Sequence, residues 1–175
     1  NSFKVNKKLF ESYINEYSSL FGQKGSIASN ILRDDIQKES WKKIGPVRTA
    51  KGIKEMEDKI KEIETKLNDI SIPNYFIWNQ AFMDFVELKN MICSAKLIGL
   101  AAKERNGSIG GHVRLDAKNI SIFSRPYSTV VHKNNNTYLV KKLNRTRTPL
   151  KNLIYYKILE KKRLLEARFL SMLPK

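Results

Sequence analysis

The most regular alternation of apolar and polar residues lies in the middle third of the chain. Between about residues 51 and 70, apolar side chains recur in steps of three and four, separated mostly by lysine and glutamate: Ile53, Met56, Ile60, Ile63, Leu67 and Ile70. This spacing predicts a helix with one apolar stripe. The stripe covers about two and a half heptads, which is too short for an independent coiled coil. We therefore expect this helix to pack inside a bundle.

Two further helices are predicted on the N-terminal side of this stripe. Residues 7–21 place their apolar side chains on one face, and Gly22 ends the pattern. Residues 30–44 have a second helical pattern, and Ser29 or Asn30 can cap its first turn. The sequence therefore predicts an amphipathic N-terminal helix, a short linker and a second helix before the stripe.

A longer helix is predicted over about residues 74–105, and it is apolar around most of its circumference, including residues 76–78. Such a helix lies between other elements. Asp84, Glu87 and Asn90 share one of its faces. We expect Glu87 and Asn90 to be buried hydrogen-bonding groups that fix the register of the bundle. An acid/base pair of carboxylates is less favoured, because nothing else in the sequence indicates a pocket.

The pattern changes after this helix. Residues 127–132 and 137–143 are β-branched and aromatic runs, separated by Lys133-Asn134-Asn135-Asn136. Asparagine tolerates left-handed backbone, so the two runs predict a β-hairpin. Helical spacing returns over residues 150–173, with a basic opposite face. The chain therefore ends in a predicted basic amphipathic helix.

Composition and charge narrow the class of protein. The 175 residues are 41% hydrophobic and 29% charged, which is typical of one globular domain or one domain with an appendage. A single cysteine and two distant histidines exclude an intrachain disulfide and argue against a Cys/His metal site. No apolar run approaches the roughly 18 residues of a transmembrane helix.

The net charge of +16 is concentrated near the C-terminus. Residues 117–175 carry 14 Lys/Arg and 2 Asp/Glu, a net of +12, whereas residues 1–116 carry 19 and 15, a net of +4. A nearly balanced domain is thus followed by a basic segment. Such a segment is typical of proteins that bind nucleic acid, an anionic lipid surface or an acidic protein.

Motifs of common enzymes are absent from the sequence. It has no G-x-G-x-x-G after a strand, no P-loop, no H-E-x-x-H and no G-x-S-x-G, and the glycine-rich residues 107–111 follow a helix rather than a strand. Cys93, on the apolar helix, is better explained as a small buried hydrophobe than as a nucleophile. For His112, a turn in which Arg114 and Asp116 satisfy buried backbone groups is favoured over direct catalysis.

Four segments, in order and at similar spacing, resemble a known family: Leu32-Arg33-Asp34-Asp35-Ile36-Gln37, Gly45-Pro46-Val47-Arg48-Thr49 with Gly52-Ile53, Glu87-Leu88-Lys89-Asn90-Met91-Ile92, and Gly107-Ser108-Ile109-Gly110-Gly111-His112-Val113-Arg114-Leu115-Asp116. Over roughly residues 28–143 the chain resembles the C-terminal helical domain of the succinate dehydrogenase and fumarate reductase flavoprotein subunit. L-aspartate oxidase and the adenylylsulfate reductase flavoprotein are relatives in this family.

The resemblance implies a mainly α fold: an antiparallel three-helix bundle, similar to a spectrin repeat, followed by a small β-hairpin and a basic C-terminal helix. We divide the chain accordingly into an N-terminal helix and linker (1–28), the bundle with its Gly-Gly-His loop (29–116), a hairpin segment (117–149) and the basic helix (150–175). Ile109 stands where the family has arginine. The helix after Pro149 resembles an extension beyond the usual end of the family.

The resemblance also implies a parent activity, the interconversion of succinate and fumarate with FAD as cofactor. FAD-binding and capping domains would hold the flavin and the substrate, and this chain, a fragment or a split subunit, would hold neither and contribute no catalytic residue. Its candidate interface and loop residues are Gly110, Gly111, His112, Arg114, Asp116, Arg48, Glu87 and Asn90. Implied partners are those domains, a membrane-anchored complex and an iron–sulfur subunit, inside the cell on the cytoplasmic or matrix side of a respiratory membrane.

Two alternatives stay open for the basic residues. One is a nucleic-acid-binding helical module, because lysine and arginine are interleaved with tyrosine after residue 125. Against it, the basic residues are dispersed around aliphatic positions and no known reader motif is present. The other is that the last helix binds anionic lipid or an acidic partner protein.

Overall fold

The computed structural model describes residues 6–117, 125–135, 137–146, 149, 151–152, 154–159 and 161–162. The chain divides into two compact units. Of the described residues, the first unit holds 6–117, 129–135 and 137–141, and the second holds 125–128 and those from residue 142 onward. The predicted domain boundaries stay predictions.

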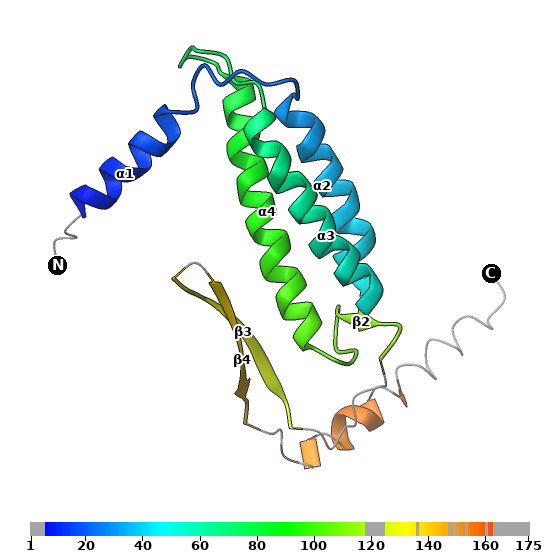
Figure 1. Cartoon of the computed structure of the whole chain (residues 1–175). Helices are drawn as coiled ribbons and strands as arrows, with labels where there is room; N and C mark the ends of the chain where they lie inside the picture. Colours follow the sequence, from blue (N-terminus) through cyan, green and yellow to red (C-terminus); the bar gives the residue numbers. More distant parts are fainter. Residues whose placement is uncertain are drawn as a thin grey trace, which may run out of the picture. The chain divides into compact units, whose positions relative to one another are not determined.

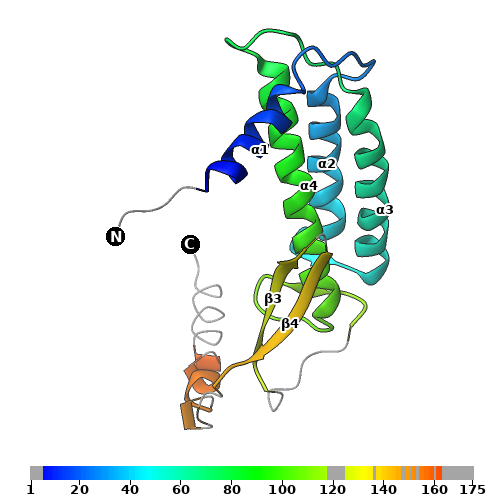
Figure 2. The ribbon, with the colours of Figure 1, turned by 60° about the vertical axis from the view of Figure 1, so that its left-hand side comes forward.

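Three helices of the first unit lie side by side (Figures 1 and 2): α2 (Ser29–Ile44), α3 (Ala50–Lys66) and α4 (Gln80–Glu104). α3 runs opposite to the other two, and each contacts both others. A shorter helix, α1 (Lys7–Ser18), precedes them, and a 3-10 turn, η1 (Leu67–Asp69), follows α3. The expectation of a mainly helical protein is therefore confirmed. Likeness to a spectrin repeat stays a prediction.

The core of the bundle is made of the predicted apolar stripe and its partners. Ile53, Met56, Ile60 and Ile63 of α3 are buried, and so is Ile70 after η1. They pack with buried residues from α2, α4 and the connecting loop: Leu32, Ile36, Ile44, Ile72, Phe85, Leu88, Ile92, Ala95 and Ala102. Each fully buried aliphatic side chain contributes about 1.5–3 kcal/mol. The stripe therefore holds the bundle together, as its spacing predicts.

The predicted N-terminal helix forms, but its apolar stripe does not enter this core. No residue of α1 is buried, and about half of the surface of four large side chains is exposed: Leu9, Phe10, Tyr13 and Ile14. Among the described residues, ring contacts of α1 are confined to its C-terminal end, where Tyr17 lies edge-on to Phe82 at 6.1 Å between centroids. Lys89 of α4 also donates a 2.6 Å hydrogen bond to Glu16. α1 is thus joined to the bundle at one end.

The prediction that the long helix begins near residue 74 is wrong, because α4 begins at Gln80. The Asn79 side chain accepts a hydrogen bond from the N–H of Phe82 (3.0 Å) and donates to the carbonyls of Pro73 (2.9 Å) and Tyr75 (2.8 Å). This cap makes α4 begin at Gln80 and holds residues 73–79 as a loop. Residues 76–78, expected inside the helix, are therefore exposed, and Trp78 has a φ of 57°.

The other predicted helix ends are also shifted. The helix expected to reach residue 70 ends at Lys66, where η1 begins. Neither Ser29 nor Asn30 caps α2, because its N-cap is Ala28, which makes no side-chain cap. The Ser29 hydroxyl instead donates a 2.8 Å hydrogen bond to the carbonyl of Ala81. This bond joins the first turns of α2 and α4, which run in the same direction.

The predicted hairpin is confirmed as β3 (Tyr127–Asn134) and β4 (Thr137–Asn144). Asn135 in its turn has a φ of 51°, the left-handed backbone that asparagine tolerates. Of the predicted helix over residues 150–173, positions 151–152, 154–159 and 161–162 are helical, and the rest lies outside the described residues. No helix within the described ranges is both long and apolar enough to cross a membrane.

Candidate functional site

A two-stranded parallel ladder brings together two of the segments that carry the family resemblance. β1 (Val47–Arg48) precedes α3, and β2 (Val113–Arg114) follows α4. The N–H of Val113 donates to the carbonyl of Pro46 (2.9 Å), and the N–H of Leu115 donates to that of Arg48 (3.1 Å). The ladder places Arg48 opposite Arg114, which the sequence pattern did not predict.

Arg114 is 7% exposed and every nitrogen of its guanidinium has an acceptor. Nε and Nη2 donate to the two carboxylate oxygens of Asp116 at 2.9 and 3.1 Å. Nη1 donates to the carbonyls of Ala102 (3.2 Å) and Arg105 (3.3 Å), at the end of α4. Arg114 thus satisfies backbone groups that helix ends leave without partners. It has the structural role considered for it from the sequence.

Asp116 extends this cluster to α3. Its Oδ2 accepts a 2.6 Å hydrogen bond from the N–H of Ala50, the first residue of that helix. Thr49 caps the same end by accepting from the N–H of Gly52 at 3.0 Å. Arg114 and the Ala50 N–H stabilise the ionised carboxylate and hold the pKa of Asp116 well below its usual range. We call Arg114, Asp116 and the Ala50 N–H the arginine clamp.

The loop before β2 is closed by its own hydrogen bonds. The Ser108 hydroxyl accepts from the N–H of Arg114 at 2.9 Å and donates to its carbonyl at 3.3 Å. Ile109 and His112 exchange backbone hydrogen bonds of 2.8 and 3.0 Å across Gly110 and Gly111. Gly110 has a φ of 55°, which favours glycine. The predicted Gly-Gly-His segment is therefore a tight, exposed turn.

His112 is half-buried at the end of this turn, with Nε2 3.3 Å from the carbonyl of Arg105. Burial, and then the charge of Arg48, lower the pKa of the imidazole from its ordinary value. The ring is therefore neutral at neutral pH. Cys93 lies elsewhere, on α4, with Sγ 3.5 Å from the hydroxyl of Tyr138 in β4. The structure does not bring the histidine and the cysteine together.

Arg48 differs from the other arginines of the cluster. It is partly buried, and its Nε is a buried donor for which no described residue supplies an acceptor. Burial, followed by repulsion from Arg114, lowers the pKa of Arg48. Within the described part of the chain it forms no salt bridge. Its positive charge therefore has no carboxylate partner among the residues that the structure describes.

The expectation that Glu87 and Asn90 are buried is wrong, since both are exposed and the buried member of that face is Asp84, at 7%. Asp84 accepts hydrogen bonds from Arg33 of α2 and, at 3.0 Å, from Gln80. The pattern alone could not choose among the three positions, because the rotation of α4 against α2 decides it. Arg33, which sequence reasoning did not single out, lies in the first resembling segment.

Neither a metal nor FAD has an evident site in the described residues. They contain no group of three His, Cys, Asp or Glu side chains placed to hold a metal ion. The segment that leads from β1 into α3 is Arg48-Thr49-Ala50-Lys51-Gly52. It lacks the glycine-rich turn that seats a pyrophosphate at a helix N-terminus. This helix N-terminus therefore does not fit the pyrophosphate of FAD.

A family model described as "Fumarate reductase flavoprotein C-term" matches residues 33–166. The chain belongs to this family. The resemblance drawn from its motifs is therefore confirmed: the family is that of the succinate dehydrogenase and fumarate reductase flavoproteins, which are FAD-dependent oxidoreductases. The match also corrects one expectation, because the helix after Pro149 lies largely within the family range rather than beyond it.

Individual relatives of this chain are also fumarate reductase subunits. A component of the CoM/CoB fumarate reductase of Methanothermobacter marburgensis is 29% identical over 92 residues, which are 53% of this chain and 17% of the relative. The 8-methylmenaquinol:fumarate reductase flavoprotein subunit of Wolinella succinogenes is 30% identical over 86 residues, 49% of this chain and 14% of the relative. The chain thus spans about a sixth of these relatives.

The fold is also that of a solved flavoprotein. A structure of E. coli quinol fumarate reductase with a substituted FrdA polypeptide matches 85% of this chain and 27% of its own, with a TM-score of 0.73. The sequence identity is 18%, so this likeness shows the fold alone.

Proposed function

We propose that this chain is the C-terminal helical domain, as a fragment or a split subunit, of an FAD-dependent flavoprotein that interconverts succinate and fumarate. Its role is mechanical: it supports the FAD-binding and capping domains. The observation that carries this proposal is the arginine clamp. His112, Arg114 and Asp116 of the resembling loop make hydrogen bonds that fix the loop. This arrangement favours a structural role for them over a catalytic one.

The clamp fixes three points of the bundle to one another. Arg114 binds carbonyls at the end of α4, Asp116 binds the start of α3, and β2 binds β1. Hydrogen bonds to charged groups are stronger than those between neutral groups. A loop held in this way is a firm surface, which is what limiting the movement of a capping domain requires.

In this proposal FAD, which supplies hydride transfer when bound, belongs to domains that this chain does not contain. Those domains are the first partners. A membrane-anchored complex and an iron–sulfur subunit are further partners, on the cytoplasmic or matrix side of a respiratory membrane. Support comes from the two relatives above, both named as fumarate reductase subunits.

The test is to tag the endogenous chain and purify it under mild conditions. We expect a flavin-containing polypeptide to accompany it, fused or separate, with flavin absorbance and succinate oxidation by an artificial acceptor. The same purification from an untagged strain is the control. Purified chain with no flavin in any fraction would contradict the proposal.

The basic hairpin favours one second candidate, a nucleic-acid-binding module. Its strands and ends expose Lys133, Lys141, Arg125 and Arg145. Binding to DNA or RNA would weaken steeply as salt is added, because each phosphate contact releases counterions. No binding at low salt would exclude this function.

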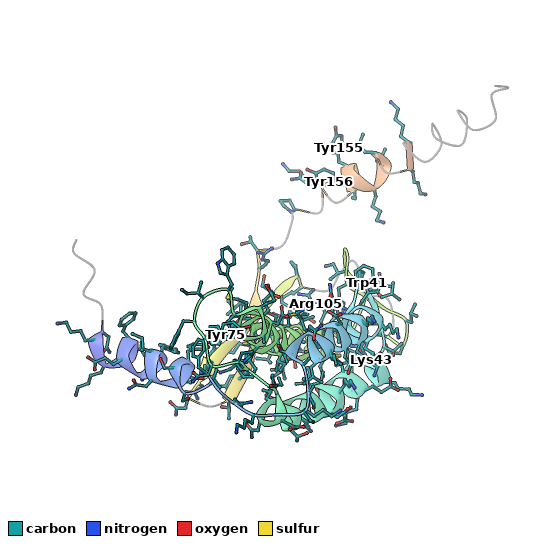
Figure 3. All side chains as sticks on the ribbon, turned by 90° about the horizontal axis from the view of Figure 1, so that it is seen from above. Trp41, Lys43, Tyr75, Arg105, Tyr155 and Tyr156 are labelled. Carbon is teal, nitrogen blue, oxygen red and sulfur yellow. The ribbon has the colours of Figure 1, made fainter. Side chains whose placement is uncertain are left out.

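The last helix carries a separate proposal, that it binds anionic lipid or an acidic protein of the complex. In the described residues it exposes Ile154, Tyr155, Tyr156 and Ile158 beside lysines. Tyr155 and Tyr156 are labelled in Figure 3. Removing residues 148–175 should abolish binding to phosphatidylglycerol vesicles in the first case and assembly with the acidic protein in the second.

A further inference from the structure

Trp41, near the end of α2, is a large apolar side chain with 74% of its surface exposed. It borders two grooves. One, of about 600 Å3, is lined on its far side by Met91 and Ile98 of α4. The other, of about 580 Å3, leads to Arg48 and Leu115. Trp41 and Lys43 both project from α2 (Figure 3). We call the lining of the second groove, which includes Trp41, Val47, Arg48 and Leu115, the Trp41–Arg48 surface.

The apolar part of this surface is larger than the indole. Val47 is 49% exposed and Leu115 is 70% exposed, and both line the second groove. Exposed apolar side chains gathered around a groove mark interaction sites more often than scattered ones do. Tryptophan and arginine are also the residue types most enriched among those that dominate binding energy at protein interfaces.

The charged part of the surface is Arg48, whose guanidinium would be stabilised by one anionic partner. Arg33 and Arg114 each face a carboxylate within the chain, Asp84 and Asp116 respectively. Arg48 faces none in the described ranges, although its Nε is buried and Arg114 lies nearby. A desolvated charge without a counter-ion is costly, and a carboxylate at its reachable end offsets that cost.

The neighbouring lysines do not share this need. Glu39 pairs with Lys43 at 2.8 Å and with Lys42 at 3.4 Å. A nucleic-acid strand is bound by a row of uncompensated cations. Here a single uncompensated arginine lies beside apolar side chains, which fits one acidic side chain with an apolar neighbour on a protein.

We propose that the Trp41–Arg48 surface docks the flavin-bearing part of the flavoprotein, whose carboxylate pairs with Arg48 and whose apolar side chain packs on Trp41. This inference rests on the proposed function and names the contact through which it acts. We assign the contact to Arg48 rather than to Arg114, because each nitrogen of the Arg114 guanidinium already donates to an acceptor inside the chain.

The experiment measures association of the 175-residue chain with the flavin-containing polypeptide that accompanies it, produced as separate proteins. We expect Arg48→Gln and Trp41→Ala each to weaken binding, with a dissociation constant raised by about 30-fold, the loss typical of a central interface residue. Lys51→Gln removes the same charge from a side chain that is 88% exposed, and Trp78→Ala removes the other tryptophan, 94% exposed. Both controls should bind as the wild type does.

Each outcome decides one claim. If the wild type does not bind the flavin-containing polypeptide, the proposed function fails. If it binds and the two surface variants bind as tightly as their controls, the proposed function stands and the docking surface is wrong. Thermal unfolding of each variant separates lost binding from lost folding.

Fluorescence gives a second measurement without a surface variant. The chain has two tryptophans, so Trp78→Phe leaves Trp41 as its sole indole. With a flavin-depleted, tryptophan-free variant of the partner, the emission of Trp41 should shift to shorter wavelength on binding, because the indole leaves water. Binding with unchanged emission would overturn the assignment of Trp41.

Discussion

The backbone N–H of Ala50 donates a 2.6 Å hydrogen bond to Asp116, which lies 66 positions further along the chain. The carboxylate therefore contacts the N-terminus of α3, where the helix dipole favours negative charge. Through its ion pair with Arg114 the same group is joined to the end of α4. One side chain thus connects two helix ends and the loop that carries the family resemblance.

Asp116→Asn should lower stability in a pH-dependent way. Because the pKa of Asp116 is depressed in the folded state, its contribution is fully present above the unfolded value of about 3.9. It is lost as the pH falls below that value toward the folded pKa. Urea unfolding should therefore give a larger free energy of unfolding for the wild type than for D116N at pH 6. The two values should converge in acid.

Asp58→Asn is the matched control for this prediction. Asp58 lies on the exposed face of α3, 3.2 Å from Lys54. Its replacement should change the unfolding free energy by no more than about 0.5 kcal/mol. Equal effects of the two substitutions would mean that Asp116 does not link the helix ends.

Arg48→Gln should raise the pKa of His112. Burial is the largest cause of its lowered pKa and the charge of Arg48 comes next, so removing that charge restores only part of the shift. Titration of the imidazole by NMR measures this, with His112→Gln to assign the signal. Lys51→Gln should leave the His112 titration as it is, and an equal shift there would assign the effect to general charge.

The same pKa sets the direction of a stability change. His112 resists protonation in the folded state, whereas an unfolded histidine binds a proton below about pH 6.5. Its contribution is therefore complete above that pH and decreases as the pH falls toward the folded pKa. Arg48→Gln should reduce this decrease as the pH falls below about 6.5, which lies above the range in which Asp116 acts.

The bundle could be predicted from the sequence because its information is local. The stripe from Ile53 to Ile70 has one period, and its core-facing residues follow from that period alone. The hairpin was predicted for the same reason, from two β-branched runs around asparagines. Buried elements with a strong period leave little for tertiary contacts to decide.

The clamp could not be predicted in the same way, because its contacts join distant positions. β1 and β2 are two residues long and pair across α3 and α4, so no periodicity marks them. The start of α4 was misplaced because Asn79 uses three hydrogen bonds to end an apolar run that otherwise looks helical. Which of Asp84 and Glu87 is buried depends on helix rotation.

Asn79→Ala should destabilise the protein by about 2 kcal/mol, because the variant loses the helix cap and leaves two carbonyls without donors. Asn79 is 4% exposed, so water does not readily replace these bonds. Asn79→Asp is the matched variant, since it keeps the acceptor for Phe82 and loses both donors. In chemical unfolding, the free energy of unfolding of Asn79→Asp should lie between those of the wild type and of Asn79→Ala. If aspartate matched wild type, the bonds to Pro73 and Tyr75 would carry no stability.

Gly25→Ala tests the close approach of two backbone segments at one end of the bundle. A Cβ at position 25 would lie 2.1 Å from the carbonyl oxygen of Asp69 and 2.6 Å from the carbonyl carbon of Ile70. Neither is a side chain that can turn away. The two segments are also held together, since the N–H of Ile27 donates to Asp69 at 3.0 Å and the N–H of Ser71 donates to Ile27 at 2.9 Å.

The alanine must therefore push the linker away from η1 and break these bonds, at a cost of at least about 2 kcal/mol. Gly111→Ala is the control, because a Cβ there would meet no atom within 4 Å. Thermal unfolding should show a clear decrease in Tm for G25A and little change for G111A. If G25A melted with G111A, the linker would not be packed against η1, and the paired carbonyl of Asp69 would have to be satisfied by water instead.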